Sequence, residues 1–373
     1  MFIMFAISFL IFFYELLSLI LPLKISIYMK IFMSIVLLSA SFKNYIFQKL
    51  GGGMFFAPDL PRYVVLIGAF LYNFLIVLLF LLIIKDVIFL VLRIFGVSLI
   101  SVDLVLKAIL LSSFLLTIYG TYEAIRVPDI ETHEVKIENL GSDFDGLKIA
   151  MLVDLHVSAL NKQPLIESIV EKTNNLKPDV ILIPGDFVDG LVKDRKKDLE
   201  PLKNLKSKFG VLGTTGNHEY YSGYKEWVKV LSDMGIKFLE NESVILESGD
   251  SKLIIAGVPD TQGKAFNFTA PDLEKALENT PKEIPIILME HRPENARENP
   301  KHKIDLQVSG HTHGGMMPIL SQIVAKFNGG FVKGFYEIEN MKLYVSKGTS
   351  LWNGFPMRLL DPSEITLFIL RKK

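Results

Sequence analysis

Two kinds of hydrophobic pattern divide the chain near Arg126. Before this point apolar residues are almost uninterrupted, and four stretches are long enough to predict membrane-spanning helices. These stretches are 1–21, 25–42, 64–84 and 104–122. A fifth stretch, 87–100, is shorter and contains Arg93, so we expect an interfacial or re-entrant piece, although five spans remain an alternative. The intervening segment 43–62 contains three consecutive glycines and two prolines, which favours a loop.

The apolar third of the chain predicts an integral protein of the cell membrane. Its first segment lacks a basic start and a small-residue cleavage pattern, which favours a retained helix over a cleaved signal peptide. The number of long apolar runs disfavours the alternative of buried helices in a soluble protein. Five basic residues flank the first and third loops and three flank the second: Lys24, Lys30, Lys85, Arg93 and Lys107 against Lys43, Lys49 and Arg62. This balance favours an extracytoplasmic side for the C-terminal domain, and a fifth span would reverse that orientation.

After Arg126 the pattern becomes that of a soluble α/β domain, in which short apolar runs alternate with segments of helical spacing. The predicted strands are 134–140, 147–153, 180–183, 211–214, 243–247, 252–257, 284–288, 305–308, 334–339, 341–345 and 365–370. The predicted helices are 164–176, 199–209, 223–234 and 271–277, and the lysine-rich segment 193–197 is expected to be a solvated loop. We therefore divide the chain into a transmembrane region (1–125), a linker with the first strand (126–145) and an α/β domain (146–373).

Composition narrows the possible functions. Lysine plus arginine and aspartate plus glutamate number 40 each, so net charge gives no indication of nucleic-acid binding. The sequence contains no cysteine, which excludes disulfides, thiolate zinc sites and a cysteine nucleophile. The mean hydropathy of +0.36 is high, and the excess comes from the apolar first third.

Polar, metal-binding residue types recur at the ends of the predicted strands. Asp186 and Asp189 follow the strand 180–183 through a Pro-Gly turn, the usual place for ligands at the carboxyl end of a strand. One such motif is weak evidence, because aspartate and glycine are common turn residues. Similar groups follow other apolar runs: Asp154 and His156, Asn217 and His218, His291, and His311 and His313. Five of the seven histidines stand in such places, which predicts a shared site.

The candidate ligands combine carboxylate, carboxamide and imidazole groups. They are Asp154, His156, Asp186, Asn217, His291, His311 and His313. This set suits Mn²⁺, Fe or Zn²⁺ and suits Mg²⁺ less well. Seven ligands fit two divalent ions that share a carboxylate and activate water for attack on a phosphoester. His218 would face the substrate as a proton donor or charge stabiliser, with Asp189 accepting from its other ring nitrogen.

For other polar and aromatic residues we expect structural, supporting or packing roles. His133 and His302 lie in charged surroundings and are expected to be structural. Glu219 and Glu290 adjoin the predicted site, where we expect supporting or solvent-facing roles and not metal ligation. Tyr220 and Tyr221 are expected to pack, although contact with substrate is an alternative for them.

The ordered series of motifs resembles the calcineurin-like metallophosphoesterase family. The series is Asp-Leu-His at 154–156, Gly-Asp-Phe-Val-Asp at 185–189, Gly-Asn-His-Glu at 216–219, His291, and Gly-His-Thr-His-Gly-Gly at 310–315. The likeness runs from about Asp145 to the C terminus, and the segment 347–358 resembles the membrane-associated branch. It implies an N-terminal all-α transmembrane bundle followed by an α/β metallophosphoesterase domain, a four-layer αββα sandwich with its site at the carboxyl ends of the strands.

The resemblance also implies how the residues divide between two metal ions. Asp154, His156, Asp186 and His313 would hold one ion. Asp186 would bridge to the other, which Asn217, His291 and His311 would also hold. His218 would be the catalytic imidazole, paired with Asp189. The sequence departs from the family's usual pattern at Val153, at Met316 and in Glu290-His291-Arg292, so substrate contacts are where we expect differences.

These observations predict a membrane-anchored, dinuclear-metal phosphoesterase acting on a phosphodiester, pyrophosphate or phosphomonoester near the bilayer. Similarity to UDP-2,3-diacylglucosamine hydrolases makes a lipid-linked substrate, and hence lipid metabolism, the preferred class. A membrane receptor or transporter with a regulatory phosphoesterase domain is an alternative, although the spans carry few polar groups. A tethered protein phosphatase would be expected to add arginines near the metal motifs, where Arg292 is one candidate. A tethered nuclease would need a basic groove, so no nucleic-acid partner is expected.

Overall fold

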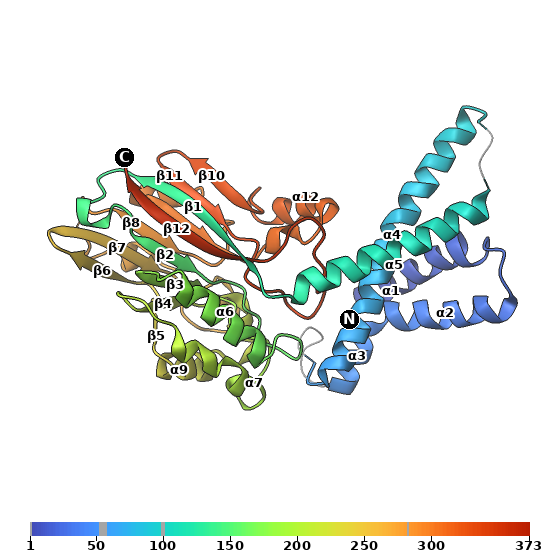
Figure 1. Cartoon of the computed structure of the whole chain (residues 1–373), viewed down its shortest axis with the longest axis horizontal. Coiled ribbons are helices and arrows are strands. Elements are labelled where there is room, and N and C mark those ends of the chain that lie inside the picture. Colours follow the sequence, from blue (N-terminus) through green and yellow to red (C-terminus); the bar gives the residue numbers. More distant parts are fainter. Residues whose placement is uncertain (1, 52–57, 98–100, 282) are drawn as a thin grey trace. The chain divides into compact units, whose positions relative to one another are not determined.

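The computed structural model describes residues 2–51, 58–97, 101–281 and 283–373. The chain forms two compact units (Figure 1). The first contains Met1–Glu123 together with Asn353–Met357, and the second contains Ala124–Trp352 and Arg358–Lys373. Each unit is described by itself below.

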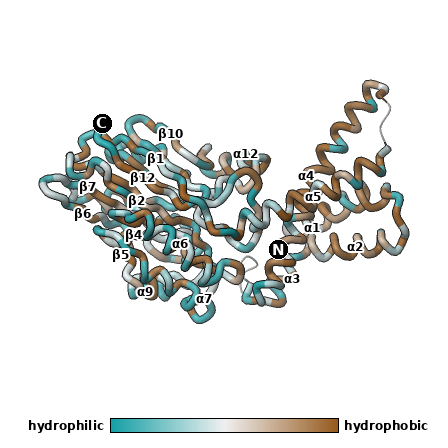
Figure 2. The backbone as a smooth tube through the Cα atoms, viewed as in Figure 1, coloured by the Kyte–Doolittle hydropathy of each residue, from teal (hydrophilic) through white to brown (hydrophobic). Residues whose placement is uncertain are grey.

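The first unit is helical and strongly apolar (Figure 2). Its helices are α1 (Phe2–Glu15), continued by a π-helical turn at Leu16–Ile20, α2 (Ile27–Ser41), α3 (Lys43–Gly51), α4 (Arg62–Ile94) and α5 (Val102–Ile125). In the described residues, α4 and α5 are long and apolar enough to cross a membrane, and α2 with α3, bent by 63°, could form a third span. The apolar helix Phe5–Ile20 is shorter, so two or three of the described helices have the length of a span, and the four spans expected from the sequence remain a prediction.

The expected interfacial piece at 87–100 is wrong for its described part, because α4 continues without a break to Ile94. Two charged residues that precede this stretch in α4, Lys85 and Asp86, make contacts within the unit. Lys85 Nζ donates to both the backbone and hydroxyl oxygens of Ser18, at 2.9 and 2.8 Å. Asp86 accepts from the hydroxyls of Tyr14 and Ser18, each at 2.6 Å. These contacts with α1 and its π-helical turn let charged residues stand within a long helix. Residues 98–100 lie outside the described part.

The expected loop at 43–62 contains the helix α3. Its first residue, Lys43, is buried, and its Nζ donates to the carbonyl oxygen of Gly354 at 2.7 Å and lies 4.6 Å from the ring centre of Tyr72. The hydrogen bond and the contact with the aromatic ring compensate the burial of the lysine side chain. Hydropathy along the sequence does not show such contacts, so it did not predict this helix. Residues 52–57, which include two of the three glycines, lie outside the described part.

The second unit is built on two six-stranded sheets. The first sheet has the order β1 (Asp129–Ile137), β12 (Glu364–Lys372), β2 (Lys148–Met151), β3 (Val180–Pro184), β4 (Val211–Thr214) and β5 (Ile236–Phe238). The second has the order β10 (Gly334–Ile338), β11 (Met341–Val345), β9 (Leu306–Ser309), β8 (Ile286–Met289), β7 (Ser251–Gly257) and β6 (Glu242–Ser248). In each sheet the central strands β2–β3–β4 and β7–β8–β9 run parallel, so their carboxyl ends share one edge.

The two sheets pack face to face. Alternate residues of a strand point to opposite sides of its sheet, so each strand has residues in the core between the sheets and residues on the outer face. Ile149 and Met151 of β2 join the core shared with β7 and β8, whereas Ala150 faces the helices. The outer face of the first sheet is covered by α6 (Gln163–Asn175) and α9 (Tyr224–Asp233). The outer face of the second sheet is covered more thinly, by α11 (Leu273–Ala276) and irregular segments. The arrangement is the expected four-layer sandwich with one thin layer.

The structure differs from the predicted elements between strands β3 and β4 and near the C terminus. The lysine-rich segment expected to be a loop forms α7 (Val192–Leu199), in which Arg195 is buried. The expected helix 199–209 is reduced to a 3₁₀ segment at Glu200–Asn204, since Pro201 disfavours continuation of α7. Four further helices and strands were not predicted: α8 (Asn217–Ser222), β5, α10 (Gln262–Ala265) and α12 (Pro318–Phe327).

The long helix α5 predicts the membrane topology of the domain that follows it. Its 24 residues span about 36 Å, enough to cross a bilayer once. The chain is cysteine-free, so single substitutions Val97→Cys, just before α5, and Ser232→Cys, on α9, can be labelled without background. We expect a membrane-impermeant maleimide added to intact cells to label one of the two variants. The other variant should be labelled only after the cells are permeabilised. Equal labelling of both from the same side would contradict a spanning α5.

Candidate metal centre

The seven predicted ligands all lie just beyond the carboxyl ends of strands. Asp154 and His156 follow β2, Asp186 follows β3, Asn217 follows β4, His291 follows β8, and His311 and His313 follow β9. These strands come from both sheets, whose parallel parts bring the loops together. The described residues contain two separate groups of these side chains whose ligand atoms lie within 4.8 Å of one another.

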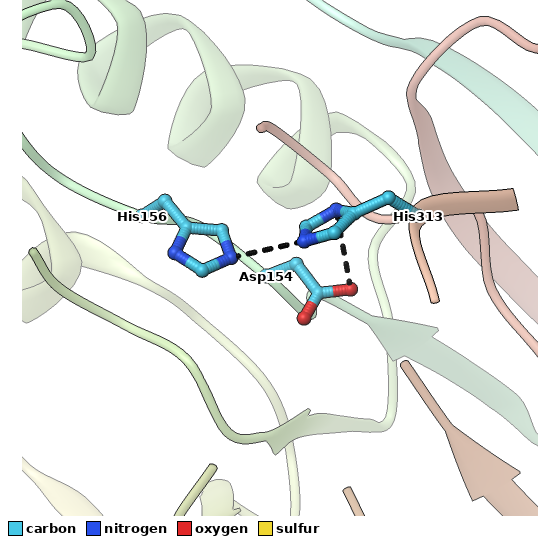
Figure 3. A group of neighbouring side chains, drawn as sticks. All are labelled: Asp154, His156 and His313. Carbon is cyan, nitrogen blue, oxygen red and sulfur yellow. Dashed lines mark hydrogen bonds and ion pairs between the residues drawn. The ribbon is translucent and has the colours of Figure 1, made fainter. Parts of the chain in front are cut away.

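The first group consists of Asp154, His156 and His313 (Figure 3). His156 Nε2 lies 3.2 Å from His313 Nε2, and His313 Nδ1 lies 3.9 Å from Asp154 Oδ2. All three side chains are buried. Two imidazole nitrogens and a carboxylate so close together, with little solvent, form a suitable site for a divalent cation.

The second group consists of Asp186, His291 and His311. His291 Nδ1–H donates to the carbonyl oxygen of Pro184 at 2.8 Å, which leaves its Nε2 lone pair facing Asp186 Oδ2 at 3.2 Å. A histidine anchored through one ring nitrogen so that the other is presented is the usual arrangement of a metal-binding imidazole.

Asp186 connects the two groups. Its Oδ2 lies 3.2 Å from His291 Nε2 in the second group and 3.6 Å from His156 Nε2 in the first. Burial raises the pKa of its carboxyl group, but the neighbouring imidazoles, His291 first, outweigh burial and hold that pKa well below its usual range. The carboxylate is therefore ionised between two sets of nitrogen donors.

Several buried lone pairs near Asp186 have no hydrogen-bond partner in the described part of the chain. They belong to Asn217 Oδ1, His291 Nε2 and His313 Nδ1. Leaving buried polar atoms unsatisfied is unfavourable, and a bound cation would satisfy all three. The donor set thus fits divalent ions by its chemistry as well as by its proximity.

Five candidate ligands have backbone conformations that residues other than glycine rarely adopt. Their φ angles are 57° at Asp154, 41° at His156, 55° at Asp186, 70° at His311 and 51° at His313. Each such conformation costs about 1–3 kcal/mol and needs support from surrounding contacts. This clustering of strain is typical of functional sites.

Glu219 supplies part of that support. Its buried carboxylate accepts from the backbone N–H groups of Asp186 at 3.0 Å, Phe187 at 2.7 Å and Gly216 at 2.8 Å. It therefore ties the loop after β3 to the loop after β4. Of the two roles expected for Glu219, the supporting one fits these contacts and the solvent-facing one does not.

Arg358 supports the other side of the site and was not identified from the sequence as a site residue. Its buried guanidinium donates to the carbonyl oxygens of His313 at 3.2 Å, Asp361 at 3.0 Å, Lys347 at 2.6 Å and Ser350 at 2.9 Å. Its place in the segment 347–358 that resembles the membrane-associated branch was the available signal. The guanidinium thus ties the backbone of His313 to the segment 347–361.

Asp189 accepts hydrogen bonds from two histidines, whereas the sequence predicted one. Its Oδ1 accepts from His218 Nδ1–H at 2.5 Å and from His156 Nδ1–H at 3.1 Å. Burial lowers the pKa of His218, but Asp186 and Asp189 outweigh burial and raise it to about 9. Burial likewise raises the pKa of Asp189, but His156 and His218 outweigh it and lower that pKa to about 2. One ionised carboxylate thus orients a candidate ligand and the candidate acid together.

The remaining sequence candidates have separate environments. Glu290 accepts from Asn299 and Gln307 at 2.7 and 3.1 Å, away from the two groups. His133 packs on β1 with its Nε2 3.1 Å from the Tyr344 hydroxyl, a structural role as expected. His302 ends a short 3₁₀ segment, Asn299–His302.

The two tyrosines of α8 differ from each other. Tyr220 stacks on Tyr224 at a centroid distance of 4.8 Å and is a packing residue. The Tyr221 ring lies 5.5 Å from the His218 ring, so Tyr221 borders the candidate site, and its contact with substrate stays a prediction.

Comparison with known proteins identifies the family. The model of the calcineurin-like phosphoesterase family matches residues 147–315. A transmembrane protein with metallophosphoesterase domain from Danio rerio is 33% identical over 272 residues, covering 70% of this chain and 62% of that protein. An uncharacterized metallophosphoesterase from Helicobacter pylori is 36% identical over 256 residues, covering 68% of this chain and 67% of its own length.

A third relative, an uncharacterized metallophosphoesterase from Campylobacter jejuni, is 35% identical over 272 residues and is covered over 70% of its length. The chain thus spans less than two thirds of the fish protein and somewhat more of the two bacterial ones. The matched segment 147–315 contains every candidate ligand and the pair Asp189 and His218. This protein belongs to the calcineurin-like phosphoesterase family.

Proposed function

We propose that this protein is a membrane-associated, metal-dependent phosphoester hydrolase whose site holds two divalent ions. The observation that carries the proposal is the position of Asp186, whose Oδ2 faces a histidine of each group at 3.2 and 3.6 Å. Family membership supports metal-dependent phosphoester hydrolysis. The apolar helices α4 and α5 and the transmembrane relative support membrane association.

In this proposal Asp154, His156, Asp186 and His313 hold one ion. The second ion shares Asp186 and is held also by Asn217, His291 and His311. The unsatisfied lone pairs of Asn217, His291 and His313 support this division. Mixed nitrogen and oxygen donors favour Mn²⁺, Fe or Zn²⁺ over Mg²⁺. Bound ions would supply charge stabilisation for the phosphoryl oxygens and a water of lowered pKa.

His218 would deliver a proton to the leaving oxygen. Its Nδ1–H is held by Asp189, and its Nε2 lies 4.0 Å from Asp186 Oδ2, beside the proposed bridge. Asp186 and Asp189 both favour the imidazolium form. The group is thus oriented and charged for donation to an oxygen that develops negative charge.

For the substrate we favour a phosphodiester, pyrophosphate or phosphomonoester attached to a lipid. Membrane-spanning helices in the same chain would keep the hydrolase among membrane substrates, which supports this class. One observation supports the receptor or transporter alternative: Glu15 in α1 is fully buried, and neither carboxylate oxygen has a hydrogen-bond partner among the described residues. An unsatisfied carboxyl group in a membrane helix is often functional.

Removal and return of metal tests the proposed chemistry. We expect detergent-purified protein to hydrolyse an aryl phosphodiester or monoester, to lose turnover on chelation and to regain it with Mn²⁺ or Zn²⁺. Asp186→Asn should abolish turnover, and His218→Gln should lower kcat by about 10²–10⁴-fold, the usual contribution of a general acid. His302→Gln and Asp250→Asn are matched controls outside the site and should retain activity. Metal-independent turnover, or a fully active His218→Gln variant, would refute these roles.

Asp189 offers a test that separates its two partners. Asp189→Asn should lower turnover and also weaken metal affinity about 10–100-fold, because His156 loses the carboxylate that orients it. His218→Gln should lower turnover with metal affinity unchanged. Metal titration by calorimetry measures the difference, and equal metal affinities for Asp189→Asn and wild type would show that Asp189 does not orient a ligand.

A further inference from the structure

The helix α12 of the α/β unit exposes an apolar face (Figure 1). Ile319, Ile323 and Phe327 stand four residues apart, so their side chains form one stripe along the helix. Their exposed fractions are 45, 52 and 76%. Single exposed apolar residues are common, but a stripe of large ones on one helix face usually marks a contact with another protein or with a membrane.

The opposite face of α12 is fixed to the loop of the candidate metal centre. Ser321 is buried, and its hydroxyl donates to the carbonyl oxygen of Gly314 at 3.0 Å. A Cβ atom at Gly315 would lie 2.4 Å from Ser321 Cα, so the helix and the loop are in close contact. Both glycines directly follow the candidate ligand His313. Packing inside the unit therefore sets the orientation of α12 and leaves its apolar stripe outside.

Leu360 extends the apolar surface near the start of α12. The neighbouring Leu359 N–H donates to the carbonyl oxygen of Met316, two residues before the helix, at 2.9 Å. Leu360 is 77% exposed and has a φ angle of 68°, in the left-handed region that leucine rarely adopts. The side chain of this strained residue thus faces outward and not into the core. We call the following four residues the α12 surface: Ile319, Ile323, Phe327 and Leu360.

Polar residues border the α12 surface as they do in helices that lie in a membrane interface. Gln322 and Lys326 are exposed next to the apolar stripe on the same helix. Interfacial helices bury large apolar side chains at the boundary between headgroups and acyl chains, and their lysines extend to the headgroups. The residues that α12 exposes are therefore of the kinds that a lipid surface binds.

The chain itself carries the segments that anchor it in a bilayer. The helices α4 and α5 are long and apolar enough to cross a membrane, and α5 ends at Ile125, four residues before β1 begins at Asp129. Four residues of extended chain span at most about 14 Å. The α/β unit is thus tethered to a membrane by a short linker. A tether raises the effective concentration of lipid, so a patch too small to bind a bilayer by itself can still engage one.

We propose that the α12 surface inserts into the bilayer that α4 and α5 cross, so that the α/β unit makes a membrane contact of its own. This inference concerns how the unit binds lipid, and it does not depend on the proposed hydrolysis. Because α12 is bonded to the loop that carries His313, insertion would hold that loop close to the lipid headgroups.

Fluorescence quenching in lipid nanodiscs tests the proposal. The chain has no cysteine, so Ile323→Cys and Phe327→Cys each allow a single NBD label on the full-length protein. The nanodiscs contain phosphatidylcholine and phosphatidylglycerol, and the quencher is either a nitroxide-labelled lipid or aqueous iodide. We expect the lipid nitroxide to quench both labels strongly, and iodide to quench them several-fold less than it quenches a label on a surface that faces water.

Ile245→Cys provides that reference, because Ile245 is also an exposed isoleucine but lies on β6. Iodide should quench its label, and the lipid nitroxide should have little effect. A second variant keeps the label at residue 323 and adds Ile319→Gln and Phe327→Gln. Iodide quenching at residue 323 should then rise to the level of the Ile245 label. Leu191→Gln, which changes an exposed leucine outside the α12 surface, should leave it unchanged.

Three results would overturn the proposal. Iodide quenching at residues 323 and 327 as strong as at residue 245 would show that α12 faces water. Protection of both labels from both quenchers would show that protein covers α12, such as a second copy of this chain. Lipid quenching at residue 323 that survives both glutamine substitutions would show that the apolar stripe does not drive insertion.

Discussion

The arrangement of the α/β unit depends on the buried negative charge of Asp186. Its carboxylate is almost fully buried and lies within 4.0 Å of ring nitrogens from three histidines, His156, His218 and His291. A buried charge is strongly unfavourable unless nearby charges or donors compensate it. The neighbouring histidines supply this compensation in the protein alone, and divalent ions between them would supply more.

The loops around Asp186 are strained, and the rest of the unit holds them in place. Parallel strands from two sheets deliver the ligands to one edge, but five of those residues then require a left-handed backbone conformation. Glu219 binds two N–H groups of the loop that carries Asp186 and one at Gly216. Arg358 binds the carbonyl oxygen of His313 and three carbonyl oxygens of the segment 347–361. Hydrogen bonds to these backbone groups compensate the burial of the two charged side chains. The same bonds satisfy the polar groups of the strained loops.

Much of this could be predicted from the sequence, because strand ends and metal-binding residue types are local features. The motifs around Asp154, Asp186 and His311 identified side chains that the structure brings together. Relations between distant segments were not predictable. The sharing of Asp189 by two histidines, the three bonds of Glu219 and the anchoring of Arg292 by Asp260 all join residues that lie far apart in the chain or on different loops.

The membrane part was predicted less well for the same reason. The short stretch 87–100 with its Arg93 suggested an interfacial piece, but α4 continues to Ile94, and Lys85 and Asp86 within it are satisfied by contacts with Ser18 and Tyr14. Hydropathy along the chain cannot register compensation from another helix. The buried Lys43 in α3 is a second example, since its partner Gly354 is supplied by the far end of the chain.

The proposed bridging of two metal ions by Asp186 is tested most directly by electron paramagnetic resonance of the Mn²⁺-loaded protein. Two Mn²⁺ ions joined by a carboxylate should give the broad, temperature-dependent spectrum of an exchange-coupled pair, and Asp186→Asn should convert it to signals of uncoupled ions. A wild-type spectrum of isolated Mn²⁺ alone, with the ligands saturated, would contradict the account.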